Sequence, residues 1–226
     1  GLRVDIYAQP CRVGYSANCL SGLSLAFGKL ILFCDQDDVW CADKIERIEH
    51  VAAVSDKALF SHDIEIIPRR GDAPIPSLLS HLAAEGSGPQ VCIKGHTLTL
   101  RRDFVLQWGP PPLNLFSYDL WYALLATLAD QRLCVPEVLV QHRLHETNAS
   151  GWIPAARDAG SLLQDARHPA EPLLDLCVKD RVEERLQALE QALSARLAKP
   201  CTALAAALEV ISQHRARTAA VTVAGA

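Results

Sequence analysis

A short apolar run that ends abruptly in acidic residues constrains this chain more than any other feature. Residues 30–33 (Leu-Ile-Leu-Phe) have the composition of a buried strand, and Asp35, Asp37 and Asp38 follow at once. In an open α/β sheet, ligands bind in the crevice outside the carboxyl ends of the strands. Three carboxylates there repel one another and resist desolvation unless a cation neutralises them. The pattern therefore predicts an α/β fold and a site for a hard divalent cation that itself carries phosphates.

The same acidic run has a structural interpretation. Asp is favoured at helix N-caps, and Asp38 or Asp43 would then cap a helix that begins near Lys44. Capping needs only one acid, however, and gives no reason for three acids directly after a buried strand. We therefore favour the cation site.

Composition limits the class of protein. The 226 residues suit one substantial domain with a helical appendage, and half of them are hydrophobic. The net charge of −4 gives no electrostatic reason to expect nucleic acid as a partner. No apolar run has the length of a membrane span, and the eight cysteines form no C-x-x-C pair. We expect a cytoplasmic protein with reduced cysteines; attachment to the inner face of the membrane is an alternative without support in the sequence.

Hydrophobic periodicity predicts the order of the elements. Strands are predicted over 2–8, 30–34 and 58–67, with a helix over 43–54 between the last two. This alternation is typical of an α/β sheet. After residue 140 the strand signal stops, and helices are predicted over 178–198 and 202–214. We expect a domain over 1–155 and a C-terminal helical region over 156–226, which covers the first domain or mediates self-association.

The acidic run belongs to an ordered series of motifs, spread over residues 3–152. The series is Gly14 with Asn18, Ala26-Phe27-Gly28-Lys29, the acidic run, Asp43-Lys44-Ile45, Gly95-His96-Thr97, Tyr118-Asp119-Leu120-Trp121, and the stretch from Arg143 to Gly151. Together these motifs closely resemble the family 2 glycosyltransferases of GT-A fold, especially the rhamnosyltransferase-like branch of bacterial polysaccharide synthesis. The resemblance implies a mixed, Rossmann-like sheet flanked by helices.

The resemblance also implies a reaction. Family members transfer a sugar, here for example from dTDP-rhamnose, to an acceptor hydroxyl on a glycan or lipid-linked acceptor, with inversion. By resemblance Asp35 contacts the donor ribose or sugar, Asp37 coordinates Mg²⁺ or Mn²⁺ on the diphosphate, and Asp38 supports one of them. A metal acting as Lewis acid would stabilise the negative charge on the leaving nucleoside diphosphate.

The other motifs acquire roles by the same resemblance. Asp119 matches the carboxylate that serves as general base, because direct displacement needs a base opposite the leaving group; helix capping is the alternative. Arg143 and His145 match a loop that closes over the diphosphate, with His145 as a ligand of the metal or phosphate and Arg143 as a charge partner. Gly95 and His96 are expected to let the backbone approach the donor or acceptor, because Gly has no side chain.

The sequence also departs from the family pattern. The opening strand with its Pro-Thr-Tyr-Asn-like turn and the second strand with its Asp-Asp-Gly-Ser-like turn are not found, and the chain has no methionine, even at position 1. We therefore expect an N-terminally truncated sequence that lacks the first βαβ portion and by itself binds a sugar nucleotide weakly or not at all.

Two further interpretations stay open. A non-catalytic module, with a relic of the site and C-terminal helices that bind a partner, would have the same sequence pattern. A metal-dependent phosphohydrolase is disfavoured, because the sequence offers no second cluster of His and Asp ligands.

Overall fold

A mixed five-stranded sheet forms the centre of the molecule. The computed structural model describes residues 3–68, 73–145, 170–171, 173–174, 181–196 and 202–224. The strand order is β1-β4-β3-β5-β2. The strands are β1 (Leu30–Leu32), β2 (Val39–Trp40), β3 (Leu59–Ile67), β4 (Leu98–Arg101) and β5 (Arg132–Arg143). Only β3 and β5 run parallel; the other pairs are antiparallel.

Of the two long strands, β3 and β5, β3 is the more deeply buried. Nearly every residue of β3 is buried, which is typical of a strand covered on both faces. The β3–β5 register shifts between His62 and Asp63, opposite Pro136 and Glu137. Proline has no N–H to donate to a ladder, so the irregularity falls where the pairing would be broken anyway.

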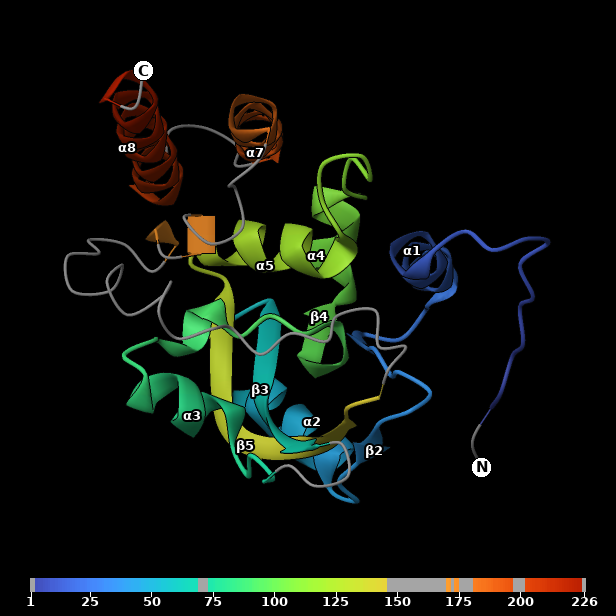
Figure 1. The fold of residues 1–226 in the computed structure, drawn as a ribbon. Coiled ribbons are helices and arrows are strands. Elements are labelled where there is room, and N and C mark those ends of the chain that lie inside the picture. The colour runs from blue at the N-terminus through green and yellow to red at the C-terminus, as the bar shows by residue number, and fades with distance from the viewer. Residues whose placement is uncertain are drawn as a thin grey trace.

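Helices lie against both faces of the sheet. They are α1 (Tyr15–Leu25), α2 (Lys44–Val54), α3 (Leu78–Ala84), α4 (Arg102–Trp108) and α5 (Tyr118–Leu128), with short 3-10 turns η1 (Pro89–Val91) and η2 (Gly95–Thr97). Nine of the eleven residues of α5 are buried, because α5 lies between the sheet and the C-terminal helices (Figure 1). The apolar composition of this helix is therefore explained by burial on all sides.

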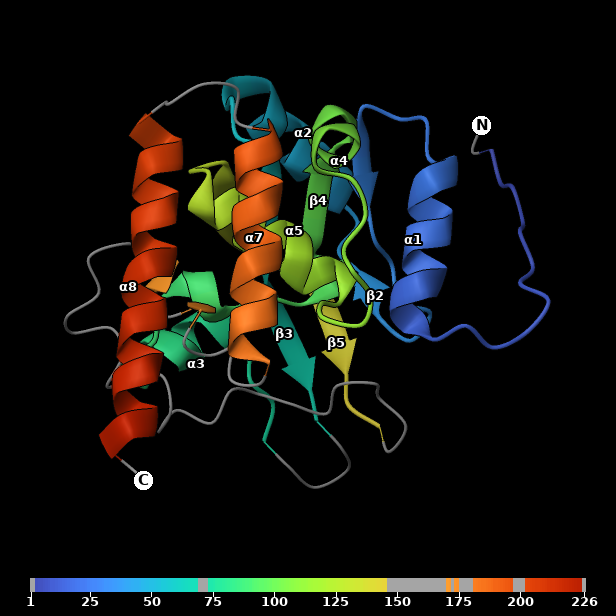
Figure 2. The ribbon, with the colours of Figure 1, turned by 90° about the horizontal axis from the view of Figure 1, so that it is seen from above.

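Two C-terminal helices form an outer layer. α7 (Val182–Arg196) and α8 (Thr202–Ala224) lie side by side across α4 and α5 (Figure 2). Arg215 of α8 bonds Glu183 and Glu190 of α7 at 2.8 Å each. No helix in the described part of the chain has the length and apolar composition of a membrane span. The predicted boundary near residue 155 falls outside the described residues.

Two details differ from the sequence prediction. The strand predicted over 2–8 is not formed; residues 3–9 have no regular structure and run outside α1 (Figure 2). Val4 and Ile6 are accordingly 70% and 89% exposed, because this segment pairs with no other described strand. In α2 the periodicity predicts Ile45, Ile48 and Val51 on one buried face. The buried positions are instead Lys44, Ile48 and Ala52, and Ile45 is 55% exposed.

Candidate functional site

The acidic loop, residues 33–38, connects β1 to β2. Because β1 ends at Leu32 and β2 begins at Val39, the loop turns sharply and brings its acids together. Carboxylate oxygens of Asp35, Asp37 and Asp38 all lie within 4.8 Å of one another. The structure therefore forms the three-carboxylate cluster that the sequence predicted after the apolar strand.

Asp38 is the buried member of the cluster. Its side chain has no exposed surface, and its Oδ1 accepts a 2.7 Å hydrogen bond from Nδ1 of His142. Its Oδ2 lies 3.2 Å from Nδ1 of His96, but in a direction that forms no hydrogen bond. Among the described residues this buried oxygen has no hydrogen-bond partner. A buried acceptor of this kind is costly, and a cation between the carboxylates would satisfy it, so the donor set fits a hard divalent ion.

Asp37 is more exposed than Asp38 and less exposed than Asp35, and it pairs with His145. Nε2 of His145 contacts Oδ2 of Asp37, although the two residues are far apart in sequence. This hydrogen bond is the main reason that the pKa of Asp37 is lowered. The structure thus brings together the two residues predicted as metal ligands. Arg143 is the last residue of β5, two positions before His145, and it is exposed.

The capping interpretation of the acidic run finds no support in the structure. Asp43 stands at the N-cap position of α2, but its side chain makes no capping hydrogen bond. Asp38 bonds His142 instead of the helix. Neither acid is therefore explained by the helix that follows.

Gly95 and His96 form η2 beside the acidic loop. His96 is only 2% exposed, and its Nδ1 lies 3.2 Å from Oδ2 of Asp35. A Cβ on Gly95 would stand 1.9 Å from the hydroxyl oxygen of Tyr118. The space in front of Gly95 is therefore filled by a side chain of the protein. A contact of Gly95 or His96 with the donor stays a prediction.

Asp119 lies in the first turn of α5, where Ser117 is the N-cap residue. Its Oδ1 accepts from Ser117 Oγ and, at 2.9 Å, from the N–H of Leu120. No hydrogen bond to Oδ2 forms within the described ranges, so one oxygen is held while the other can accept a proton. The role of general base stays a prediction.

Tyr118 connects the acidic loop with Asp119. Its ring contacts Phe33 at a centroid distance of 4.6 Å. Burial raises the pKa of Tyr118, and both Asp119 and Asp35 raise it further. Burial also raises the pKa of the Cys19 thiol, to which the same two carboxylates contribute. Asp35 and Asp119 therefore both lie near Tyr118 and Cys19.

Two buried lysines stand near the carboxylates and were not predicted as site residues. Burial lowers the pKa of Lys44 to about 8, although Asp38 and Asp35 oppose that shift. Burial also lowers the pKa of Lys94, which lies in the field of Asp119 and Asp38. For Lys44 the sequence contained a signal, because its four-residue spacing from Ile48 places a charge on the buried face of α2.

His142 was also missed. It stands two residues after the buried Val140 in β5, so the two side chains point to the same face of the sheet. A histidine at such a position is usually a core residue, and only the folded chain shows that it reaches Asp38.

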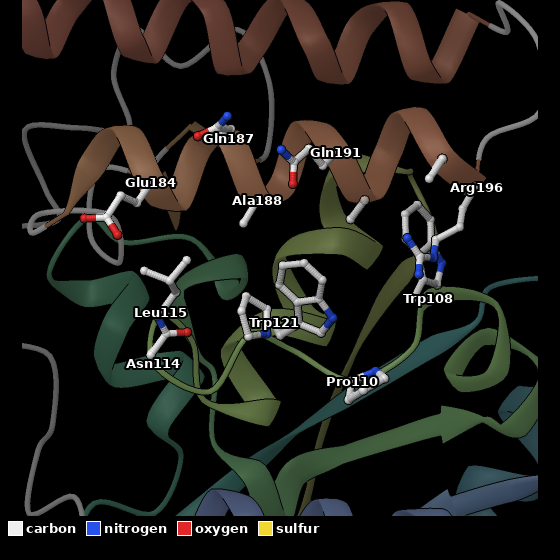
Figure 3. Close-up of a pocket in the computed structure, with 13 residues that line it drawn as sticks. Trp108, Pro110, Asn114, Leu115, Trp121, Glu184, Gln187, Ala188, Gln191 and Arg196 are labelled. Carbon is white, nitrogen blue, oxygen red and sulfur yellow. The ribbon is translucent and has the colours of Figure 1, made fainter.

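A sizeable cavity lies away from the acidic loop. A cavity of about 610 Å³ separates α7 from the α4–α5 connection (Figure 3). Its walls carry Trp108 and Trp121 on one side and Gln187, Gln191 and Arg196 on the other. Both tryptophans are 3% exposed or less, so their ring faces are closed to a ligand. None of the acids of the site lines this cavity, and we do not assign it a function.

Comparison with known proteins gives two kinds of similarity. The family model described as glycosyl transferase family 2 matches residues 1–73, which include the acidic loop. A search of curated proteins finds no significant match. Among solved structures, the mannosyltransferase PcManGT from Pyrobaculum calidifontis, in complex with GDP-Man and Mn²⁺, superposes with a TM-score of 0.52 at 16% identity over 95% of this chain. S. aureus TarS in complex with UDP-GlcNAc gives a TM-score of 0.46 at 13% identity, over 78% of this chain and 60% of that chain.

The mannosyltransferase similarity confirms the fold class. The mixed sheet flanked by helices is the GT-A fold that the motifs implied. This chain spans 61% of the length of that enzyme. At this level of identity the similarity establishes architecture, and activity has to be argued from the site.

Proposed function

We propose that this chain carries the metal and acceptor-activating part of a glycosyltransferase that uses a sugar nucleotide. The observation that carries the proposal is the buried, unpartnered Oδ2 of Asp38 within a cluster of three carboxylates. Such a cluster suits a divalent cation that bridges to a diphosphate. The match of residues 1–73 to the glycosyl transferase family 2 model supports the same activity.

In the proposed reaction each group has one task. Asp37 and His145 would hold Mg²⁺ or Mn²⁺, and Asp35 and Asp38 would complete the carboxylate cluster. Asp35 would also contact the donor ribose or sugar. The ion would neutralise negative charge on the leaving nucleoside diphosphate. Arg143 adds positive charge near the diphosphate, and η2, with Gly95 and His96, forms a wall of the donor site. Asp119 removes the proton of the acceptor hydroxyl, whose oxygen then displaces the diphosphate with inversion.

We also propose the chemical identity of the donor and of the acceptor. The rhamnosyltransferase-like motifs favour dTDP-rhamnose as donor and a glycan or lipid-linked acceptor. The reaction would belong to bacterial surface polysaccharide synthesis on the cytoplasmic side of the membrane. The C-terminal helices are proposed as a separate region, over 156–226, that covers the catalytic domain or mediates self-association.

A donor panel tests the proposal. The full-length gene product is incubated with Mn²⁺ and, in turn, dTDP-rhamnose, GDP-mannose and UDP-GlcNAc, and release of the nucleoside diphosphate is measured with and without EDTA. Release that depends on the metal and on an added saccharide acceptor is the expected result. Binding of nucleoside diphosphate without turnover of any donor would instead favour the non-catalytic module.

A further inference from the structure

Two stacked histidines support the acidic loop from its buried side. The rings of His96 and His142 are 4.7 Å apart between centroids, with an interplanar angle of 20°. His96 belongs to η2 and His142 to β5, and their exposed fractions are 2% and 6%. Side chains this well buried have their orientation fixed by packing.

Each ring bonds a different acid of the loop. Nδ1 of His142 lies 2.7 Å from Oδ1 of Asp38, and Nδ1 of His96 lies 3.2 Å from Oδ2 of Asp35. A carboxylate has only acceptors, so in both rings Nδ1 carries the proton and donates it. The two buried histidines therefore each hold one of the three carboxylates from the buried side of the loop.

The histidine pair is itself joined to the segment that follows the loop. The carbonyl of His96 accepts a 3.0 Å hydrogen bond from Nζ of Lys44. The same Nζ lies 4.0 Å from the ring centre of Trp40, in the strand that follows the loop. Trp40 pairs with Val140 of β5, two residues before His142. The acidic loop, η2, α2 and β5 are thus joined through one buried network.

We propose that His96 and His142 are positioning residues, which set the orientation of Asp35 and Asp38 and thereby the affinity of the acidic loop for a divalent cation. Three neighbouring carboxylates repel one another, and a donor behind two of them keeps their remaining oxygens directed at one point. Partners that orient metal ligands in this way affect metal affinity strongly. This inference rests on the proposed function, because it concerns the same cation.

Two substitutions of His142 distinguish a role in orienting Asp38 from a role in packing alone. In Asn the amide nitrogen is as far from Cβ along the side chain as Nδ1 is in His, whereas in Gln it is one bond further. His142→Asn therefore keeps a donor for Asp38, and His142→Gln does not. We expect His142→Gln to weaken the binding of Mn²⁺ about tenfold or more and His142→Asn to weaken it by less than about threefold. His96→Asn and His96→Gln supply the same comparison if a His142 variant does not fold.

The measurement is Mn²⁺ affinity in the full-length protein, by electron paramagnetic resonance of the free ion, with thermal unfolding as the check of the fold. His50→Asn and His50→Gln are the matched controls, because His50 is exposed on α2, and both should bind Mn²⁺ as the wild type does. Equal affinities for the Asn and Gln variants, with unchanged unfolding, would overturn the inference alone. A wild type that turns over a donor but binds no Mn²⁺ would overturn it together with the metal part of the proposed function.

Discussion

The hydroxyl of Tyr118 occupies the space into which a side chain at Gly95 would project. A Cβ built on Gly95 would lie 1.9 Å from Oη and 2.9 Å from Cζ of Tyr118. Tyr118 is 3% exposed and packs against Phe33, so its ring has little room to retreat. This contact explains why Gly stands at position 95, and it joins η2 to the helix that carries Asp119.

Gly95→Ala is expected to destabilise the protein by about 1–3 kcal/mol, the usual cost of overpacking a filled core. Because Tyr118 precedes Asp119, the same change should also lower turnover. Chemical denaturation and a transfer assay measure the two effects. Gly22→Ala is the matched control: Gly22 lies inside α1 with no atom within 4 Å of an added Cβ, so it should stabilise by about 0.5–1 kcal/mol. A Gly95→Ala protein as stable as the wild type would show that Tyr118 moves aside freely.

Asp37→Asn is expected to abolish metal-dependent transfer and to weaken Mn²⁺ binding, because it removes a charged ligand and the partner of His145. Mn²⁺ titration and turnover are measured on the same preparation. Asp43→Asn is the control, since Asp43 is exposed, follows the same loop and makes no capping bond. Undiminished Mn²⁺ binding by the Asp37 variant would remove Asp37 from the metal site.

Asp119→Asn is expected to lower kcat by about 10²–10⁴-fold, the usual contribution of a general base, with little change in Mn²⁺ or donor binding. Asparagine keeps the acceptor oxygen for Leu120 N–H but cannot take up a proton. Asp103→Asn serves as control, because Asp103 also stands in the first turn of a helix, α4, and is exposed. If kcat of the Asp119 variant equals that of the control, another group removes the proton.

Acid should destabilise the protein partly through His62. Burial, assisted by the nearby charge of Lys44, lowers the pKa of His62 to about 3, against about 6.5 for an unperturbed histidine. Between these values the unfolded chain binds a proton that the folded chain does not, so stability falls as pH falls, by up to about 1.4 kcal/mol per pH unit. Above pH ~6.5 this contribution is constant.

His62→Asn isolates that effect. Asn does not titrate, and its amide can replace the ring nitrogen that lies 2.7 Å from the carbonyl oxygen of Asp63. Urea unfolding at pH 7, 6, 5 and 4 should show that the variant loses less stability on acidification than the wild type does. Parallel pH profiles for the two proteins would mean that folding does not lower the pKa of His62.

Several conclusions needed only the sequence. Residues 30–33 followed by Asp35, Asp37 and Asp38 predicted a strand end with a carboxylate cluster, and both are formed. Local information suffices there, because the cluster lies within one loop. The strand β3 was predicted from local composition as well, because its apolar residues indicate a buried strand.

Contacts between distant segments were decided by the tertiary structure. Asp38 and His142, Asp37 and His145, and Gly95 and Tyr118 are each remote in sequence, and no local pattern states which will meet. Sheet pairing brings β5 beside β2 and so places His142 behind the acidic loop. The strand predicted over 2–8 failed because a strand is stable only with a neighbour to bond. The sequence alone thus predicted the acidic cluster. The pairing of the strands decided which side chains hold its carboxylates in place.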